Sequence, residues 1–292
     1  MEFKLIEYRD SLLRTFQHTI SFLEDNGISW SVAFGTAIGA VRHKGIIPWD
    51  DDIDIYVPRE DYEKLFTIRG ELRKYSLSMK SIEDGVGFYN GFIKIFDSNS
   101  TLWENKEFPN IIGPYVDVFP LDRTDIDSKE FAERIKMYQT AMNYYRNHII
   151  NPSIAELFDL LKGMHLKTFL KRLYWKVRPK NVMKAYKSYV ESTRLIENNE
   201  DGKFLRCIMD SSLAEIKAEW FTSFIEVPFH DFYVKLPVGY HQYLTELYGD
   251  YMQLPAEDER GSNHQHYYCN LKESLTLDEV KRRISNGEHF VA

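Results

Sequence analysis

The amino-acid sequence predicts an α+β protein, in which a mixed β-sheet with flanking helices is followed by a mainly helical second half. Two observations predict this fold class. Up to about residue 125, short apolar runs that suit buried strands are interleaved with helix-like segments and glycine turns. From residue 128 to about residue 197, the apolar residues recur mostly at helical spacing. We therefore divide the chain into residues 1–125 and residues 126–292, and we expect the C-terminal segment to pack back on the first part.

The first part is expected to open with an amphipathic helix over residues 4–26, which Asn26 and Gly27 end. Its apolar stripe consists of Leu5, Leu12, Leu13, Phe16, Ile20 and Leu23. A short buried strand over residues 30–34 then leads through Gly35 and Thr36 into a short helix over residues 37–42. A further helix is predicted over residues 59–68. Further strands are predicted over residues 53–57, 76–79, 92–96 and 115–119.

In the second part, the helical pattern over residues 128–197 is interrupted at Arg178 and Pro179, because proline ends or kinks a helix. Strand-like pieces follow over residues 224–227 and 232–236. A last helix is predicted over residues 240–247.

Composition excludes several classes of protein. With 292 residues, of which 43% are hydrophobic, the chain can bury a sizeable core and is not globally disordered. No apolar run approaches the ~20 residues that span a bilayer. Cys207 and Cys269 are too few for a disulfide scaffold or a four-thiolate zinc site. The net charge of −7 argues against a nucleic-acid binder. The charged N-terminus lacks an apolar signal region, which predicts a cytoplasmic protein.

Residues 161–190 differ from the rest of this acidic chain, since they contain nine Lys or Arg and no Asp or Glu. Leucine, tryptophan and valine residues are interleaved with the basic ones, partly at helical spacing. One interpretation is a solvated pair of helices on the outside of the fold. The alternative is an interfacial segment that makes peripheral contact with anionic lipid or with an anionic glycan carrier.

The residues that suggest chemistry concentrate between positions 33 and 54. A strand, a glycine turn and a helix at Gly35 and Thr36 can present backbone N–H groups to a phosphate, although many tight turns look the same. Arg42, His43 and Lys44 follow as three consecutive potential cations. They can neutralise a polyphosphate, or they can simply complement the dipole at a helix end.

The most informative pattern is Asp50-Asp51-Asp52-Ile53-Asp54. Alternate residues of a strand share a face, so Asp52 and Asp54 are expected to project together while Ile53 enters the core. Such a pair can bind one or two hard cations through oxygen ligands. Because like charges this close repel strongly, a metal site is favoured over the alternative, an acidic turn before a strand.

A third carboxylate is expected from a neighbouring strand. Asp117 is embedded in an otherwise apolar strand, where an acid is unfavourable unless it is paired or metal-bound. Asp122 is interpreted as a less buried turn residue. Lys94 is a lone charge in an apolar alternation, and the pattern does not decide whether it extends to solvent or reaches the acids.

At these residues the sequence resembles known proteins. Gly-Thr, followed by Asp-x-Asp on a strand and an Asp on a later strand, is similar to the nucleotidyltransferase superfamily, with a longer gap than usual between Thr36 and Asp52. The segment GTAIGAVRHKGIIPWDDDIDIYVPREDYEKL closely resembles the LicD family, to which fukutin and fukutin-related protein are similar. VDVFPLD at 116–122 and LPVGYHQYLTELYGDYMQLP at 236–255 also match. The resemblance therefore extends from residue 33 to about residue 264.

The resemblance implies a nucleotidyltransferase-like fold and a phosphotransferase that depends on Mg²⁺ or Mn²⁺. Such an enzyme moves a phospho-alcohol from a CDP-activated donor to a sugar hydroxyl of a cell-surface glycan and releases CMP. The group is phosphocholine, or glycerol or ribitol phosphate, and the acceptor is a glycan, lipid-linked or free, of lipopolysaccharide, capsule or teichoic acid biosynthesis. Residues 1–125 would be the catalytic core and residues 126–292 the half that binds the acceptor.

The resemblance also implies roles for single residues. The metal and the catalytic step are assigned to Asp52, Asp54 and Asp117, with Asp50 as an accessory ligand. We expect a second set of residues to bind the donor near its diphosphate or ribose: Gly35, Thr36, Arg42, His43, Lys44 and Lys94. Arg260 and His264 match a looser pattern and are further candidates for the donor phosphate.

Two alternatives remain open at this point. The first is a nucleotidyltransferase that adds NMP from an NTP, since this outcome needs only a different phosphorus in line with the acceptor. The second is a non-catalytic glycan- or metal-binding protein, which the intact set of Asp52, Asp54 and Asp117 argues against. A calcium module fits poorly, because the EF-hand loop with its closing Glu is absent.

Overall fold

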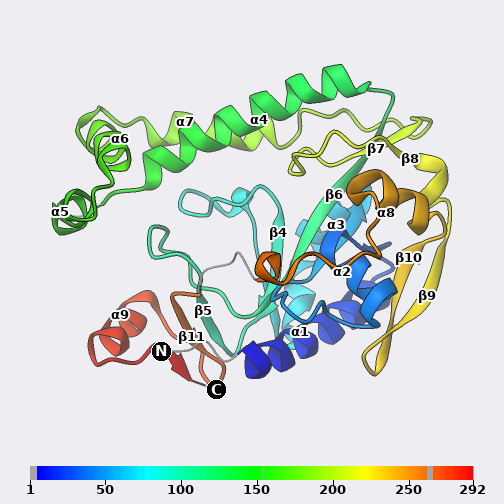
Figure 1. Ribbon diagram of the computed structural model, residues 1–292, viewed down its shortest axis with the longest axis horizontal. Helices are drawn as coiled ribbons and strands as arrows, with labels where there is room; N and C mark the ends of the chain where they lie inside the picture. Colours follow the sequence, from blue (N-terminus) through cyan, green and yellow to red (C-terminus); the bar gives the residue numbers. More distant parts are fainter. Residues whose placement is uncertain (1–4, 153, 262–265, 292) are drawn as a thin grey trace.

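The computed structural model describes residues 5–152, 154–261 and 266–291 (Figure 1). Its centre is a mixed sheet whose strands lie in the order β1 (Ser31–Val32), β2 (Asp54–Pro58), β6 (Tyr115–Thr124), β4 (Ile93–Asp97) and β3 (Leu77–Lys80). β2 and β6 are parallel, and the other neighbours in this order are antiparallel. β7 (Phe204–Arg206) pairs with the far end of β6, and β8 (Ile216–Lys217) pairs with β7.

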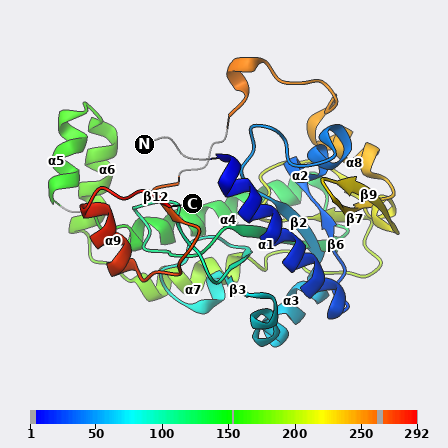
Figure 2. The same ribbon diagram turned by 90° about the horizontal axis from the view of Figure 1, so that it is seen from below.

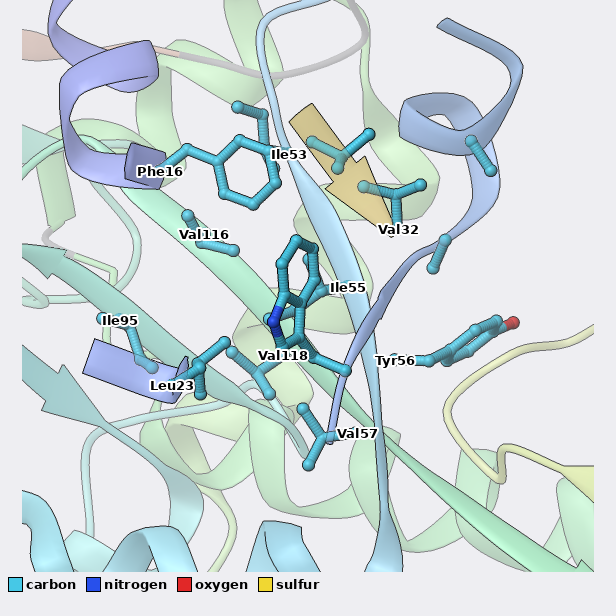
Figure 3. Packing of buried hydrophobic residues seen from close by; sticks show 14 of the residues in the cluster. Phe16, Leu23, Val32, Ile53, Ile55, Tyr56, Val57, Ile95, Val116 and Val118 are labelled. Carbon is cyan, nitrogen blue, oxygen red and sulfur yellow. The ribbon is translucent and has the colours of Figure 1, made fainter. Parts of the chain in front are cut away.

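One face of this sheet is covered by the N-terminal helix α1 (Leu5–Asp25). Figure 3 shows Phe16 and Leu23 of α1 among the sheet residues Ile53, Ile55, Ile95, Val116 and Val118, all of which are buried. Side chains alternate between the two faces of a strand. The residues between these isoleucines and valines, which include Asp54 and Asp117, therefore project from the face opposite α1.

Shorter elements surround this second face. α2 (Phe34–Ile38) and the wider π-helical turn η1 (Gly39–His43) connect β1 to the segment before β2, and α8 (Tyr240–Tyr248) packs nearby. Gly39 allows the chain to fold back on itself, because a Cβ atom there would lie 2.5 Å from the carbonyl oxygen of Gly45. The remaining short elements of the chain are α3 (Arg59–Ile68), η2 (Arg69–Tyr75), η3 (Ile82–Asp84), η4 (Ala218–Phe221) and η5 (Glu257–Glu259).

The second half contributes a layer of helices above the sheet (Figure 1). The long helix α4 (Ser128–Ile149) packs along α7 (Val182–Ser192) through a separate core that includes Tyr138, Tyr145 and Tyr189. α5 (Ile154–Lys162) and α6 (Leu166–Val177) lie at one end of the molecule in both views (Figures 1 and 2). Within the described ranges, no helix is both long enough and apolar enough to cross a membrane.

The C-terminal region returns to the first half. β9 (Phe224–Phe229) and β10 (Phe232–Pro237) form an antiparallel hairpin. β11 (Tyr268–Asn270) pairs with β5 (Thr101–Trp103) on one side and with β12 (Phe290–Val291) on the other. α9 (Leu277–Ser285) connects β11 to β12 and begins with a capping box at Thr276 and Glu279.

The predicted fold class is confirmed, since the structure is a mixed sheet with many helices. The predicted helix over residues 59–68 has the same bounds as α3. The predicted helix over residues 4–26 ends one residue beyond α1, and its predicted start lies outside the described residues. The turn at Gly35 and Thr36 differs from the prediction, because α2 already begins at Phe34 and includes both residues. Among the predicted strands β6 differs most, since it continues five residues beyond the predicted end to Thr124, and the helix α9 was not predicted at all.

The interpretation of Asp122 as a less buried turn residue was wrong. Asp122 lies within β6 and is fully buried. Its carboxylate accepts two hydrogen bonds from Arg59, with Nε–Oδ1 at 2.7 Å and Nη2–Oδ2 at 2.9 Å. A bidentate guanidinium of this kind can hold a carboxylate in the interior, which no local sequence pattern reveals.

Removing one partner of this pair should destabilise the fold strongly. In Asp122→Ala the largely buried guanidinium of Arg59 loses its bidentate partner, and we expect the free energy of unfolding to fall by about 3–5 kcal/mol. Urea denaturation measures this, with Asp231→Ala at the exposed turn between β9 and β10 as the control. A loss no larger than that of the control would show that the pair does not support the fold.

Candidate active site

A row of three charged side chains crosses the second face of the sheet. Asp54 on β2 is in register with Asp117 on β6, and Asp117 is in register with Lys94 on β4. Directly opposed residues on neighbouring strands project from the same face and lie close together. The ammonium of Lys94 lies 3.0 Å from Oδ1 and 3.3 Å from Oδ2 of Asp117. Lys94 therefore reaches the acids, which the sequence pattern left undecided.

Lys94 is the centre of a buried network. Its Nζ atom lies 3.2 Å from the centroid of the Tyr115 ring and 3.7 Å from Oε1 of Glu104. The Tyr115 hydroxyl donates to Glu104 at 2.5 Å. Cation–π contact and two carboxylates together stabilise an ammonium away from water. The prediction that Lys94 contacts the donor stays a prediction, because in this structure its charge is directed at Asp117.

The loop before β2 brings three more carboxylates to the same region. Ligand oxygens of Asp50, Asp51 and Asp52 all lie within 4.8 Å of one another. Burial, followed by the charge of Asp52, raises the pKa of Asp50 to about 8. Burial, followed by the charges of Asp52, Asp117 and Asp50, raises the pKa of Asp54 well above its usual value. Asp50, Asp52, Asp54 and Asp117 thus lie within electrostatic range as one acidic cluster.

Distant segments hold this loop in place. Arg9 of α1 donates from Nη2 to the carbonyl oxygens of Ile46 and Ile47, at 3.2 and 3.0 Å. From the turn between β9 and β10, His230 Nε2 accepts the backbone N–H of Ile46 at 3.1 Å. The loop conformation is therefore fixed by packing against α1 and β9–β10, and not by its own sequence alone.

The contact of His266 with Asp51 was not predicted. Nε2 of His266 lies 2.6 Å from Oδ2 of the buried Asp51, and the His266 ring lies 4.8 Å, centroid to centroid, from the ring of Tyr8. The two partners are 215 positions apart. Asp51 belongs to the predicted acidic run, but nothing in the sequence around His266 has the spacing of a ligand motif. Asp51 is thus in contact with the C-terminal segment.

Gly35 and Thr36 lie beside the acids, as predicted, and the structure shows a reason for each. A Cβ atom at position 35 would lie 3.0 Å from Oδ2 of Asp50, so glycine allows this carboxylate to approach the backbone. Thr36 accepts the backbone N–H of Asp54 through its hydroxyl oxygen at 2.9 Å, which fixes the start of β2. Contact of either residue with a donor phosphate stays a prediction.

Three of the predicted donor-binding cations gather around Trp49. Nε of Arg42 donates to His43 Nε2 at 2.9 Å, and the His43 ring lies edge-on to Trp49 at 5.9 Å. The guanidinium of Arg260 lies 5.2 Å from the centroid of the Trp49 ring. Burial, followed by the charge of Arg260, lowers the pKa of Arg42. Arg42, His43 and Arg260 are referred to below as the basic group.

The other predicted cations are placed differently. Lys44 is exposed and has a left-handed backbone conformation at the end of η1. Arg42 of the basic group has a second contact, since its Nη1 donates to the carbonyl oxygens of Tyr251 and Gln253 and so anchors the segment after α8. The prediction for His264 lies outside the described residues.

The donor set fits a hard divalent cation. The acidic cluster offers only carboxylate oxygens, which suit Mg²⁺ or Mn²⁺ and do not suit a soft metal. The raised pKa values of Asp50 and Asp54 show how unfavourable the negative charges are without a counter-ion. Which of these carboxylates ligate a metal stays a prediction.

The part of the chain that contains the acidic cluster matches a known protein family. The family model described as "LicD/FKTN/FKRP, nucleotidyltransferase domain" matches residues 27–162, which include all four acids. Residues 27–162 therefore match the nucleotidyltransferase domain of the LicD family. This confirms the predicted resemblance and, with it, the expected α+β architecture.

Single relatives agree with the match to the LicD family model. The chain is 27% identical over 238 residues to the lipopolysaccharide cholinephosphotransferase LicD of Haemophilus influenzae, and the match covers 81% of this chain and 87% of that protein. It is 35% identical over 60 residues to human ribitol 5-phosphate transferase FKRP, a match that covers 20% of this chain and 12% of FKRP. An uncharacterized protein of Rickettsia prowazekii is 47% identical over 51 residues, 18% of this chain and 19% of that protein. The prediction of a LicD-like enzyme is confirmed by the family match and by the two relatives that are named as transferases.

The acidic cluster should make the stability of the metal-free protein fall with rising pH. The pKa of Asp50 is about 8 in the folded protein and about 4 when unfolded, so its stabilising contribution is full below pH ~4 and is lost as the pH rises toward 8. Between about pH 6 and pH 8.5 we expect a decline of at most about 1.4 kcal/mol per pH unit, reduced by solvent screening. Thermal unfolding with a chelator present measures it.

Two matched variants show whether Asp50, and not another titrating group, causes this decline in stability with pH. Asp50→Asn should unfold at a higher temperature than the unmodified metal-free protein at pH ~8 and should show a shallower decline. Asp231→Asn should keep the original slope. If Asp50→Asn keeps the original slope as well, the acidic cluster does not carry the strain that we assign to it.

Proposed function

We propose that this protein transfers a phospho-alcohol from a CDP-activated donor to a sugar hydroxyl of a cell-surface glycan and releases CMP. The observation that carries the proposal is the match to H. influenzae LicD over 81% of the chain. Two relatives support the class of reaction, since one is named a lipopolysaccharide cholinephosphotransferase and the other a ribitol 5-phosphate transferase. The alcohol is phosphocholine, glycerol phosphate or ribitol phosphate. We place the reaction in the cytoplasm, where CDP-alcohols are available.

Mg²⁺ or Mn²⁺ is the cofactor that we propose for the acidic cluster. The cation would be bound by Asp52, Asp54 and Asp117, with Asp50 as an accessory ligand. When bound, the cation supplies positive charge that offsets the negative charge of the donor diphosphate and of its leaving group. The carboxylates alone would repel that diphosphate.

The basic group binds the donor in this proposal. His43 and Arg260 contact the ring of Trp49, which directly precedes Asp50 in the chain, and Arg42 contacts His43. The positive charges of Arg42 and Arg260 repel each other, and an anion bound between the two guanidinium groups would stabilise both. Such an anion would lie next to the acidic cluster, as the diphosphate of a metal-bound donor must.

Asp117 is the residue that we propose as the acceptor of the hydroxyl proton. Lys94 contacts both of its carboxylate oxygens and so fixes the orientation of the group. A base must be held within hydrogen-bond reach of the proton that it removes. Through this contact Lys94 would act on the reaction by way of Asp117.

The acceptor sugar is proposed to bind in a cavity between the helical half and the sheet. This cavity, of about 320 Å³, is lined by Tyr138 and Arg146 of α4, Tyr189 of α7, and Tyr89 and Phe92 before β4. Phe92 is two residues from Lys94, whose ammonium lies 5.7 Å from the centroid of the Phe92 ring. Aromatic rings suit the apolar faces of sugars, and their hydroxyl groups suit sugar hydroxyls. This is the role that we propose for residues 126–292, with residues 1–125 as the catalytic core.

Product analysis tests the proposal directly. The protein is incubated with Mg²⁺, an acceptor glycan extract, and CDP-choline, CDP-glycerol, CDP-ribitol, CTP or ATP in separate reactions. We expect CMP to be released with one CDP-alcohol, and only when both Mg²⁺ and the glycan are present. Pyrophosphate release from an NTP would favour nucleotidyl transfer instead. Glycan binding without any turnover would favour the non-catalytic alternative.

Neutralising the acids should abolish this activity. Asp52→Asn and Asp54→Asn each remove one negative charge at the proposed cation site, and we expect CMP release to fall by at least about 100-fold. Both variants should also lose the rise in melting temperature that Mg²⁺ and the donor cause together. Asp231→Asn should keep both properties. Activity within about threefold of the unmodified protein in Asp52→Asn and Asp54→Asn would exclude the assigned site.

A further inference from the structure

The hairpin formed by α5 and α6, residues 154–177, exposes an unusual amount of apolar surface. Among the described residues, 21 large hydrophobic side chains are exposed, and ten of them lie between positions 154 and 183. α6 contributes no buried residue at all within its described length. Met164, in the turn between the two helices, is 90% exposed. Scattered exposed apolar residues are normal, but such a concentration indicates a surface that binds something.

The exposed residues form one stripe on each helix. On α6 the stripe repeats at helical spacing and consists of Leu166, Leu170, Leu173 and Val177. On α5 the corresponding residues are Ile154, Phe158 and Leu161. Residues four and seven positions apart share one face of a helix. Each helix thus turns a continuous apolar face toward solvent.

The opposite side of α6 attaches the hairpin to the rest of the protein. At 100° per residue, Trp175 lies roughly opposite Leu166 and Val177. The Trp175 ring lies 5.0 Å from the ring of His148 and 5.9 Å from that of Tyr144, both on α4. Lys176 donates to the carbonyl oxygen of Pro152 at 2.7 Å. Because the hairpin is anchored through this side, its apolar stripe faces away from the protein. Figures 1 and 2 both show the hairpin at one extremity of the molecule.

The positive charge of residues 154–190 indicates which kind of partner the apolar stripe binds. Residues 154–190 contain nine Lys or Arg against two acids, Glu156 and Asp159, although the whole chain carries −7. Lys167 and Lys171 flank the stripe of α6 and are exposed. A second copy of this chain would bring two cationic hairpins together, which repulsion opposes. An apolar stripe flanked by lysines is instead the pattern of helices that lie in the interface of an anionic bilayer.

We propose that the α5–α6 hairpin docks this protein on an anionic lipid membrane, with its apolar stripe inserted at the headgroup boundary and its lysines against the lipid phosphates. Apolar contact and charge attraction act together here, so neither alone gives full binding. The proposal does not rest on the catalytic one, since no residue of the hairpin belongs to the acidic cluster or to the basic group.

Flotation of the full-length protein with lipid vesicles tests the proposal. We expect it to float with vesicles of phosphatidylcholine in which about a third of the lipid is phosphatidylglycerol, and to stay behind with phosphatidylcholine alone. Salt at ~0.5 M should lower the bound fraction, because it screens the lysines. No flotation with anionic vesicles at low salt would overturn the proposal.

Two pairs of variants locate the contact. Lys167→Glu with Lys171→Glu should weaken vesicle partitioning about tenfold or more, whereas Lys129→Glu with Lys136→Glu, on the exposed side of α4, should have little effect. Leu166→Gln with Leu170→Gln should also weaken it, whereas Met137→Gln with Leu213→Gln should not. Circular dichroism confirms that each variant folds. Equal losses in test and control variants would overturn the assignment to the hairpin.

Sedimentation without lipid tests whether the apolar stripe binds a second copy of this chain instead of a membrane. We expect the protein to sediment in the same state before and after Leu166→Gln with Leu170→Gln. Dissociation of an oligomer by this variant would show that the stripe binds a second copy of the chain, and the membrane proposal would then be wrong.

Discussion

Mutual repulsion among carboxylates is the constraint around which much of this structure is arranged. Asp50, Asp52, Asp54 and Asp117 interact electrostatically on the second face of the sheet, and burial together with this repulsion raises the pKa values of Asp50 and Asp54. Such an arrangement is unfavourable unless the surrounding fold enforces it. Several otherwise unrelated features of the chain serve this purpose.

The sheet core enforces the position of the acids. β2 and β6 are adjacent and parallel, and α1 buries the isoleucines and valines that alternate with Asp54 and Asp117. A slip of one residue would turn these acids into the core and the isoleucines out of it. The same hydrophobic packing that stabilises the fold thus sets the register of the acids. Lys94, which is buried on the next strand, compensates part of the negative charge from one side.

Segments from both ends of the chain complete the region. Arg9 from the N-terminal helix holds the backbone of the acidic loop, and His230 and His266 from the C-terminal part contact it at Ile46 and Asp51. Arg42 in turn anchors the segment after α8 through two carbonyl oxygens. The C-terminal region is therefore part of the architecture of the site, which is consistent with a LicD match that covers most of the chain.

Sequence patterns predicted those features that depend on local periodicity. The stripe from Leu5 to Leu23 predicted α1, and the alternation around Ile53 and Ile55 predicted β2 and the outward direction of Asp54. Features that depend on contacts between distant segments were missed. Arg59 buries Asp122 from 63 positions away, and His266 reaches Asp51 from 215 positions away. No local pattern contains such information, because the residues around each partner do not indicate which distant residue it contacts.

Anomalous diffraction from crystals grown with Mn²⁺ and CDP tests the central claim most directly. The account predicts a single strong anomalous region bounded by the carboxylates of Asp52, Asp54 and Asp117, with the diphosphate of CDP bound to it and directed toward Arg42 and Arg260. Manganese held elsewhere, or CDP bound away from these carboxylates, would contradict the claim that the acidic cluster is the catalytic centre of this protein.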